Sequence, residues 1–182
     1  MQLRAFAIAL LVLAVRPGVA CAGPGQFDEV SLKRGPCYRY CPAYTVTVMA
    51  DGTVRYEGRS WVKVVGKRTK RLGPVRMKQI RKAIADVRFF ELRDQYESEE
   101  DGCQAIWTDS DSAVVVLKAG GVTKTVIRYD GCRERGDEND PSKMLGAPYP
   151  RRLAEFEDTL DRIIGTREWV GAERERVRGG RH

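Results

Sequence analysis

Two cysteines with three residues between them lead directly into a β-hairpin pattern, and this stretch constrains the fold more than any other. Residues 35–44 read GPCYRYCPAY. Pro36 and Pro42 have no backbone donor, so they cannot lie in a central strand. From Tyr44 to Tyr56, apolar and polar residues alternate on either side of the turn pair Asp51-Gly52, which predicts an antiparallel hairpin. We therefore expect a disulfide-closed loop, here called the clasp loop (35–44), at the edge of a small sheet.

The first residues predict export from the cytosol. Arg4 precedes an apolar run at 5–15 that is too short to span a bilayer, and Ala20-Cys21-Ala22 fits a signal peptidase site, so 1–22 is predicted to be a signal peptide. In the alternative, Cys21 is the lipidated first residue of a lipoprotein, although Gly18 stands where an aliphatic residue is usual. We expect a periplasmic or secreted protein, or one anchored to the envelope, with membrane contact only if Cys21 is lipidated.

Four cysteines remain after the signal peptide, and an even number in an exported chain argues for two disulfides. Of the three possible pairings we favour Cys37–Cys41 and Cys103–Cys132, because each joins cysteines that flank one local unit. The second would close a loop of about thirty residues and stabilise by roughly 3–4 kcal/mol in the chain-entropy model.

The hydrophobic periodicity predicts an α+β fold with the order ββββ-α-ββ-α. It indicates an antiparallel sheet of about six strands with two helices packed on one side. The strands are expected at 27–33, 44–48, 54–56, 61–65, 113–117 and 122–129, and the helices at 74–87 and 150–164. Residues 27–171 should form one domain, with Trp169 folded back onto the core and an irregular loop at 130–149. The charged tail 172–182 should be disordered.

The charges of the chain are segregated along the sequence. The formal net charge is +7, and removing Arg4 and Arg16 leaves about +5. Residues 63–82 carry nine basic and no acidic side chains, whereas 91–111 carry eight acidic side chains and one arginine. We expect the two runs to lie on neighbouring surfaces and partly neutralise each other. In the alternative, the basic stretch binds an anionic envelope polymer rather than nucleic acid; the candidate contacts are Lys67, Arg68, Lys70 and Arg71.

The histidine content argues against most enzyme classes. The single histidine is His182, at the end of the predicted tail, so no imidazole is placed for a nucleophile pair or a histidine zinc site. We predict a non-enzymatic protein without cofactor or metal. Cys37 and Cys41 could form a redox pair, but exchange catalysts usually have two intervening residues before a helix. The acidic residues Asp109 and Asp111 are expected to be solvated.

The clasp loop is the best candidate for recognition. Tyr38, Arg39 and Tyr40 offer large contact areas with polar tips, as binding hot spots do. In the alternative, Tyr38 or Tyr40 covers the core of the sheet, and Tyr44 is expected to be buried. The leading hypothesis is therefore a non-catalytic envelope module that binds an unknown protein through this loop. A thiol–disulfide protein and a binder of anionic polymer remain as alternatives, and the residues specify no oligomeric state.

The clasp motif, the Asp51-Gly52 hairpin, the following 54–58 (VRYEG) and the closing Trp169 resemble an uncharacterised family of exported bacterial domains, DUF family 6438. The resemblance covers roughly 27–171. It implies an exported or lipid-anchored domain with no established activity. Two positions depart from the pattern: Arg39 stands where members often carry glycine, and Ser110 follows Thr108-Asp109 where members tend to have proline.

Overall fold

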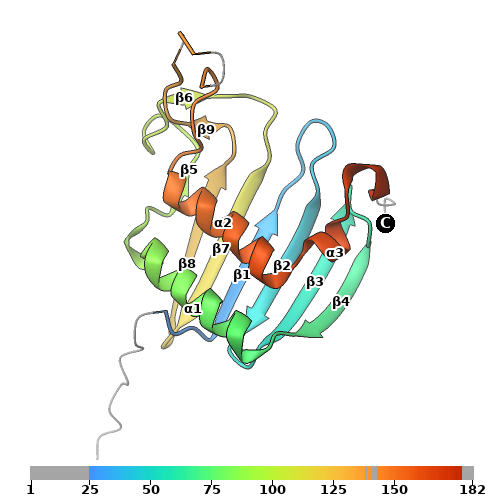
Figure 1. Ribbon diagram of the computed structural model, residues 1–182. Helices are drawn as coiled ribbons and strands as arrows, with labels where there is room; N and C mark the ends of the chain where they lie inside the picture. The colour runs from blue at the N-terminus through green and yellow to red at the C-terminus, as the bar shows by residue number, and fades with distance from the viewer. Residues whose placement is uncertain (1–24, 138, 141–142, 178–182) are drawn as a thin grey trace, which may run out of the picture.

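The computed structural model describes residues 25–137, 139–140 and 143–177 (Figure 1). The predicted signal peptide and Cys21 lie outside the described residues. A seven-stranded sheet has the strand order β4-β3-β2-β1-β7-β8-β5. Its strands are β1 (Glu29–Arg34), β2 (Ala43–Met49), β3 (Thr53–Ser60), β4 (Gly66–Arg71), β5 (Gln95–Tyr96), β7 (Ser112–Ala119) and β8 (Val122–Tyr129). Neighbouring strands are antiparallel except β5, which runs parallel to β8.

Two helices cover one face of this sheet, and Figure 1 shows them side by side across its strands. They are α1 (Pro74–Val87) and α2 (Arg151–Ile164). The predicted α+β class is thus confirmed, but the sheet is larger than expected because the two residues of β5 add a strand. A second, two-stranded sheet pairs β6 (Ala105–Ile106) with β9 (Cys132–Arg133). Such two-residue strands are too short for any alternation to reveal them. None of the described helices is long and apolar enough to cross a membrane.

The sheet has one buried and one open face because its side chains alternate between the two. On β2 and β3, Val46, Val48, Val54 and Tyr56 are almost fully buried under the helices. Burial of each such side chain contributes on the order of 1.5–3 kcal/mol. The intervening residues of these strands are partly or fully exposed. We call the side of the sheet that α1 and α2 leave uncovered the open sheet face.

Both helices form where the apolar spacing predicts them. Pro74 takes the first turn of α1, where its missing N–H costs no hydrogen bond, and the buried stripe runs from Met77 to Val87. Gly165 ends α2 with a φ of 77°, a conformation that a glycine adopts without steric cost. The buried side of α2 holds Leu153, Ala154, Phe156, Glu157, Leu160, Ile163 and Ile164. The carboxylate in this apolar stripe was not expected.

The fourth strand was predicted in the wrong place. Residues 61–65 form the connection between β3 and β4, and the strand itself is the polar segment Gly66–Arg71. The connection resembles a strand in sequence because it buries Val62. Its backbone, however, bonds to α3 (Arg167–Val170): Lys63 N donates to the Val170 carbonyl at 2.9 Å.

The C-terminal segment returns to the core and continues beyond it. Trp169 is buried, as expected, and its ring lies 4.8 Å from that of Tyr56. The disorder predicted for 172–182 is not found at its start. There η2 (Glu173–Glu175) forms a 3-10 turn, and Val177 forms a β-bridge with Val62. The composition of the segment does not reveal this pairing, because Val62 is distant in sequence. Residues 178–182 lie outside the described part.

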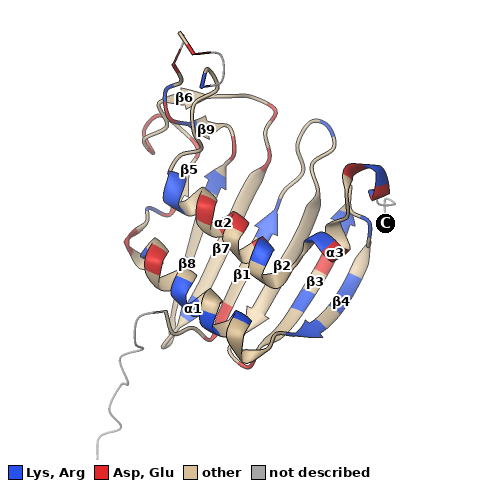
Figure 2. Ribbon diagram, viewed as in Figure 1, with Lys and Arg blue, Asp and Glu red and all other residues tan. Residues whose placement is uncertain are grey.

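The strands that belong to the two charge runs do not lie side by side. β4, from the basic run, and β5, from the acidic run, lie at opposite edges of the sheet (Figure 2). The basic run pairs instead with residues distant in sequence, such as Lys63 with Glu175 and Lys70 with Glu168. The strand order, which the sequence did not specify, keeps β4 and β5 from neutralising each other.

Candidate binding surface at the clasp loop

The clasp loop joins two inner strands, not strands at the sheet's edge as expected. It leaves the end of β1 and returns at the start of β2, and a Cys37–Cys41 disulfide closes it with a Cα–Cα distance of 5.4 Å. Gly35 N donates to the Ser112 carbonyl at 2.7 Å, which ties the start of the loop to β7. A disulfide across so short a ring mainly fixes the shape of the loop.

The aromatic side chains of the clasp loop project into solvent. Tyr38 is 78% exposed and Tyr40 is 55% exposed. The ring of Tyr40 meets that of Trp61 edge-on at 4.7 Å, a favourable aromatic geometry. Together with Cys37 and Arg39 these rings line an open hollow of about 710 Å³. Trp61 was missed as a candidate because the pattern assigned it to a strand; its φ of 53° instead marks a turn.

Arg39 is the exposed cation of this hollow. No ion pair or hydrogen bond joins it to another residue in the part of the chain that the structure describes. Binding hot spots are enriched in tryptophan, tyrosine and arginine, the side chains that line this hollow. The hollow therefore offers ring faces and one positive charge to a partner.

Tyr44 is buried, as expected, and anchors the base of the clasp loop. Its hydroxyl donates to Asp161 Oδ1 at 2.8 Å, and Thr166 Oγ1 donates to the same oxygen at 2.8 Å. Burial and the adjacent Asp161 carboxylate raise the pKa of Tyr44, so it stays a neutral donor. The start of β2 is thereby fixed to the end of α2.

A buried ionic network lies beneath the loop, and the sequence analysis missed it. Glu157 of α2 has no exposed surface, and Arg128 of β8 is 2% exposed. The two form a bidentate pair: Arg128 Nε donates to Glu157 Oε1 at 3.0 Å and Nη2 to Oε2 at 2.7 Å. Arg34, the last residue of β1, donates to Glu157 Oε2 at 3.0 Å. Within α2, only the position of Glu157 in the apolar stripe signals this network.

Arg34 connects the network to the clasp loop. Besides Glu157, it reaches Asp158 at 2.9 Å and Asp161 at 3.1 Å. Burial acts against its charge, but the carboxylates of Glu157 and Asp161 outweigh burial and raise the pKa of Arg34. Burial disfavours the charged form of Glu157 as well and so raises its pKa, and the hydrogen bonds from Arg128 oppose that rise. The residue that leads into the clasp loop is thus held by three carboxylates of one helix.

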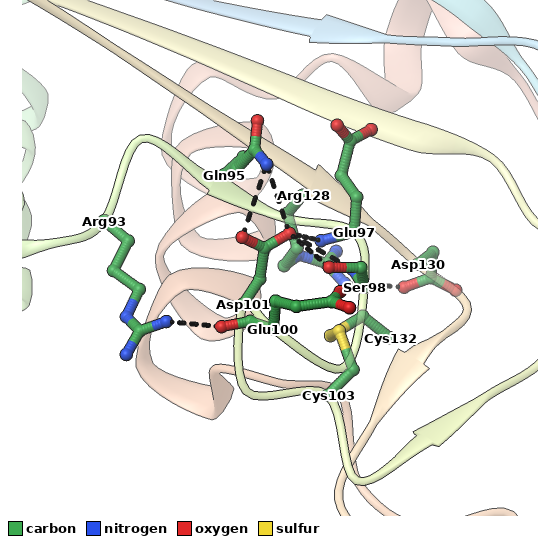
Figure 3. The surroundings of a disulfide bond; sticks show 10 residues. All are labelled: Arg93, Gln95, Glu97, Ser98, Glu100, Asp101, Cys103, Arg128, Asp130 and Cys132. Atoms are coloured by element: carbon green, nitrogen blue, oxygen red, sulfur yellow. Dashed lines mark hydrogen bonds and ion pairs between the residues drawn. A yellow bond between two sulfur atoms is a disulfide. The ribbon is translucent and has the colours of Figure 1, made fainter.

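The second disulfide fixes the neighbouring loops. Cys103 and Cys132 are bonded with a Cα–Cα distance of 5.1 Å, so both favoured pairings are confirmed. Beside it Asp101 accepts the backbone N–H groups of Glu97 at 3.0 Å and Ser98 at 3.1 Å and a contact from Gln95 (Figure 3). These backbone hydrogen bonds lower the pKa of Asp101. Because its carboxylate accepts hydrogen bonds from its own loop, Asp101 has a structural role.

Asp109 and Asp111 differ in their surroundings, and only Asp109 is as exposed as expected. Burial, together with the nearby Asp130, raises the pKa of Asp111, while Asp109 is exposed and has a φ of 64°. Asp130 is already paired with Arg128 at 3.0 Å and Arg133 at 2.9 Å. Among the described residues, no group of three His, Cys, Asp or Glu side chains could hold a metal ion.

The basic candidates lie away from the clasp loop, on edge strand β4, which β3 and β2 separate from β1. Lys70 is partly covered, with its ammonium 4.2 Å over the Trp169 ring and 2.6 Å from Glu168. Arg71 lies 3.9 Å from Asp51. Lys67 and Arg68 are exposed. The two alternative sets of site residues therefore lie on two separate surfaces.

Comparison with known families supports the resemblance noted in the sequence. Residues 28–145 match the model of a family described as a domain of unknown function, DUF6438. This range includes the clasp loop, the whole large sheet and α1, and it ends before α2. No curated protein matches the chain.

Proposed function

Because the chain belongs to the DUF6438 family, a domain of unknown function, we propose from its own geometry that it is an exported, non-catalytic binding module that holds a protein partner on the clasp loop. The observation that carries the proposal is the exposure of Tyr38 and Tyr40, at 78% and 55%, on a loop closed by a disulfide. Two disulfides are compatible with an extracellular domain.

The rigidity of the loop favours tight binding. Ordering a flexible loop and its side chains opposes association, so a loop already fixed in the free protein loses less entropy on binding. The Cys37–Cys41 bond fixes the loop itself, and Arg34 and Tyr44 fix its two ends to α2. Tyr40 is further oriented by Trp61. The exposed rings are therefore preorganised.

The test removes the two exposed rings. In Tyr38→Ala with Tyr40→Ala, partners recovered by affinity capture from the native envelope, and identified by mass spectrometry, should be lost. The dissociation constant of the identified partner should rise by roughly 30-fold or more for each hot-spot ring. The control, Val75→Ala with Val122→Ala, removes two exposed apolar side chains on α1 and at the start of β8. A folded Tyr38/Tyr40 variant that keeps every partner at native affinity contradicts the proposal.

The thiol–disulfide alternative has less support. Neither clasp cysteine begins a helix, because Pro42 leads into β2, so no helix dipole lowers a thiol pKa. A reduction potential well below that of thioredoxin, about −270 mV, identifies a structural bond. A potential above it would support exchange chemistry.

A further inference from the structure

The open sheet face presents two rows of polar side chains that the sequence does not place together. The cross-strand register over β4-β3-β2-β1 aligns one row through Lys67, Glu57, Thr45 and Lys33, and the next through Thr69, Arg55, Thr47 and Ser31. Side chains of one row lie on one face because each residue pairs directly with its neighbour across the strands. The residues between these rows on β2 and β3 are buried on the opposite, helix-covered face.

These rows border a shallow groove of about 310 Å³. Its lining includes three threonines (Thr45, Thr47 and Thr69) together with the charged Arg55, Glu57 and Lys67. Thr47 Oγ1 contacts Ser31 Oγ at 3.1 Å, and Arg59 donates to Thr45 Oγ1 at 3.5 Å. The groove therefore combines hydroxyl groups with cations along the strands.

The charge of this face is strongly positive. Lys33, Arg55, Arg59, Lys67, Arg71 and Lys118 oppose Glu29 and Glu57, which gives 6 − 2 = +4. Glu29 is paired with Lys118 at 3.0 Å. Arg55 and Lys67 form no ion pair within residues 25–177 as far as these are described. A second copy of the chain, docked face to face, would bring like charges together, whereas an anionic polymer would be attracted.

The side chains on the face indicate which polyanion fits. None of the large apolar and aromatic side chains classed as exposed in the described residues lies in the two rows, and the partly exposed Val114, Val116 and Ile127 continue them on β7 and β8. The rows on β4-β3-β2-β1 therefore offer no aromatic ring on which bases could stack. The hydroxyls and cations of the face match a chain of sugar hydroxyls and carboxylates. We propose that the open sheet face binds a linear acidic polysaccharide, with Arg55 and Lys67 as the central cations and Thr45, Thr47 and Thr69 as hydrogen-bonding contacts.

This site is separate from the clasp loop and does not depend on the function proposed for it. It shares Lys67 and Arg71 with the basic stretch of the sequence but does not coincide with that stretch. Lys63, Lys70 and Lys82 of that stretch are in ion pairs, and Arg55 lies outside it. The pairing of β3 with β4 places Arg55 and Lys67 on the same face.

The test measures binding of the full mature chain to polygalacturonate, a linear polyuronate, in 50 mM salt. Arg55→Gln with Lys67→Gln should weaken binding roughly tenfold, the effect of losing two exposed ionic contacts. It should also make binding less sensitive to salt. The matched control is Arg76→Gln with Lys78→Gln, which removes two exposed charges on α1 and should leave binding unchanged. Circular dichroism checks that both variants fold.

Three outcomes would overturn the proposal. The first is failure of the wild-type chain to retain polygalacturonate. The second is a control variant that loses as much affinity as the open-face variant, which would show that net charge alone acts. The third is tighter binding of a single-stranded oligonucleotide or a phosphatidylglycerol vesicle than of polygalacturonate at equal charge, which would assign the face to nucleic acid or membrane. The Tyr38/Tyr40 variant should bind polygalacturonate normally, so failure of one site is distinguished from failure of the other.

Discussion

Replacing Glu157 with alanine removes the carboxylate on which two guanidinium groups converge. Arg128, 2% exposed, then keeps only Asp130 as a carboxylate partner, at 3.0 Å, and Arg34 keeps Asp158 and Asp161. An arginine buried without its main partner is strongly destabilising because its charge stays desolvated. We expect the free energy of unfolding to fall by about 3–5 kcal/mol, the range measured when one partner of a buried pair is removed.

The assay is urea unfolding with the disulfides intact, followed by tryptophan fluorescence and by circular dichroism. For a domain of about 150 residues, that loss also lowers the melting temperature by roughly 6–20 °C. The control is Glu155→Ala, on the same helix but exposed, which should change stability by less than about 0.5 kcal/mol. A Glu157→Ala loss no greater than that of Glu155→Ala would refute the reasoning.

A double variant separates stability from specificity. Glu157→Leu with Arg128→Met replaces the bidentate pair by apolar side chains of similar volume. Such replacements are often neutral or stabilising, because two desolvation penalties disappear together. We expect this variant to recover most of the stability that Glu157→Ala loses, while protease cleavage in the clasp loop increases because Arg34 loses its central partner. Unchanged cleavage would show that the network does not hold the loop.

Other substitutions test the acidic, disulfide and close-packed positions. Since burial raises the pKa of Asp111, protonation of this carboxyl stabilises the fold. The stabilisation is complete below the unfolded pKa of about 3.8 and is lost as pH rises through the pKa of the folded state. Asp111→Asn should therefore raise the melting temperature at pH 7 but not near pH 3. An equal gain at both values would contradict this. Cys103→Ser with Cys132→Ser should lower the unfolding free energy by about 3–4 kcal/mol in denaturant titrations, and no loss would show that the loop is already restrained. Gly131→Ala should lower the unfolding free energy by about 1–3 kcal/mol in the same titration, because its Cβ would clash with the Trp107 carbonyl oxygen. Native stability of this variant would mean that the backbone here can shift.

Local patterns in the sequence were sufficient for the elements that bury a regular stripe. The helices α1 and α2 and the hairpins β2–β3 and β7–β8 follow from spacing and turn residues. The clasp loop was located because prolines and cysteines restrict the backbone wherever they occur. Residues 61–65 were misassigned because apolar alternation also arises in a connection whose backbone bonds to α3.

The composition of the surfaces could not be derived in the same way. Trp61 reaches Tyr40 across the β3–β4 connection, and Arg34, Arg128 and Glu157 come from three elements distant in sequence. A charged residue in a helical stripe indicates that some partner exists, but it does not identify the partner. Arg55 joins Lys67 only through the register of β3 and β4.

The sequence by itself determined the fold class and the position of the clasp loop and favoured the two disulfide pairings, because hydrophobic period, proline and cysteine act over a few neighbouring residues. Only the tertiary structure decided that the acidic and basic runs lie at opposite edges, that a buried carboxylate holds two arginines, and that one face of the sheet is open and positive. These features depend on strand order and register. Strand order and register are set when distant segments pair and bury a shared core. The local pattern of the sequence does not encode which distant segments meet.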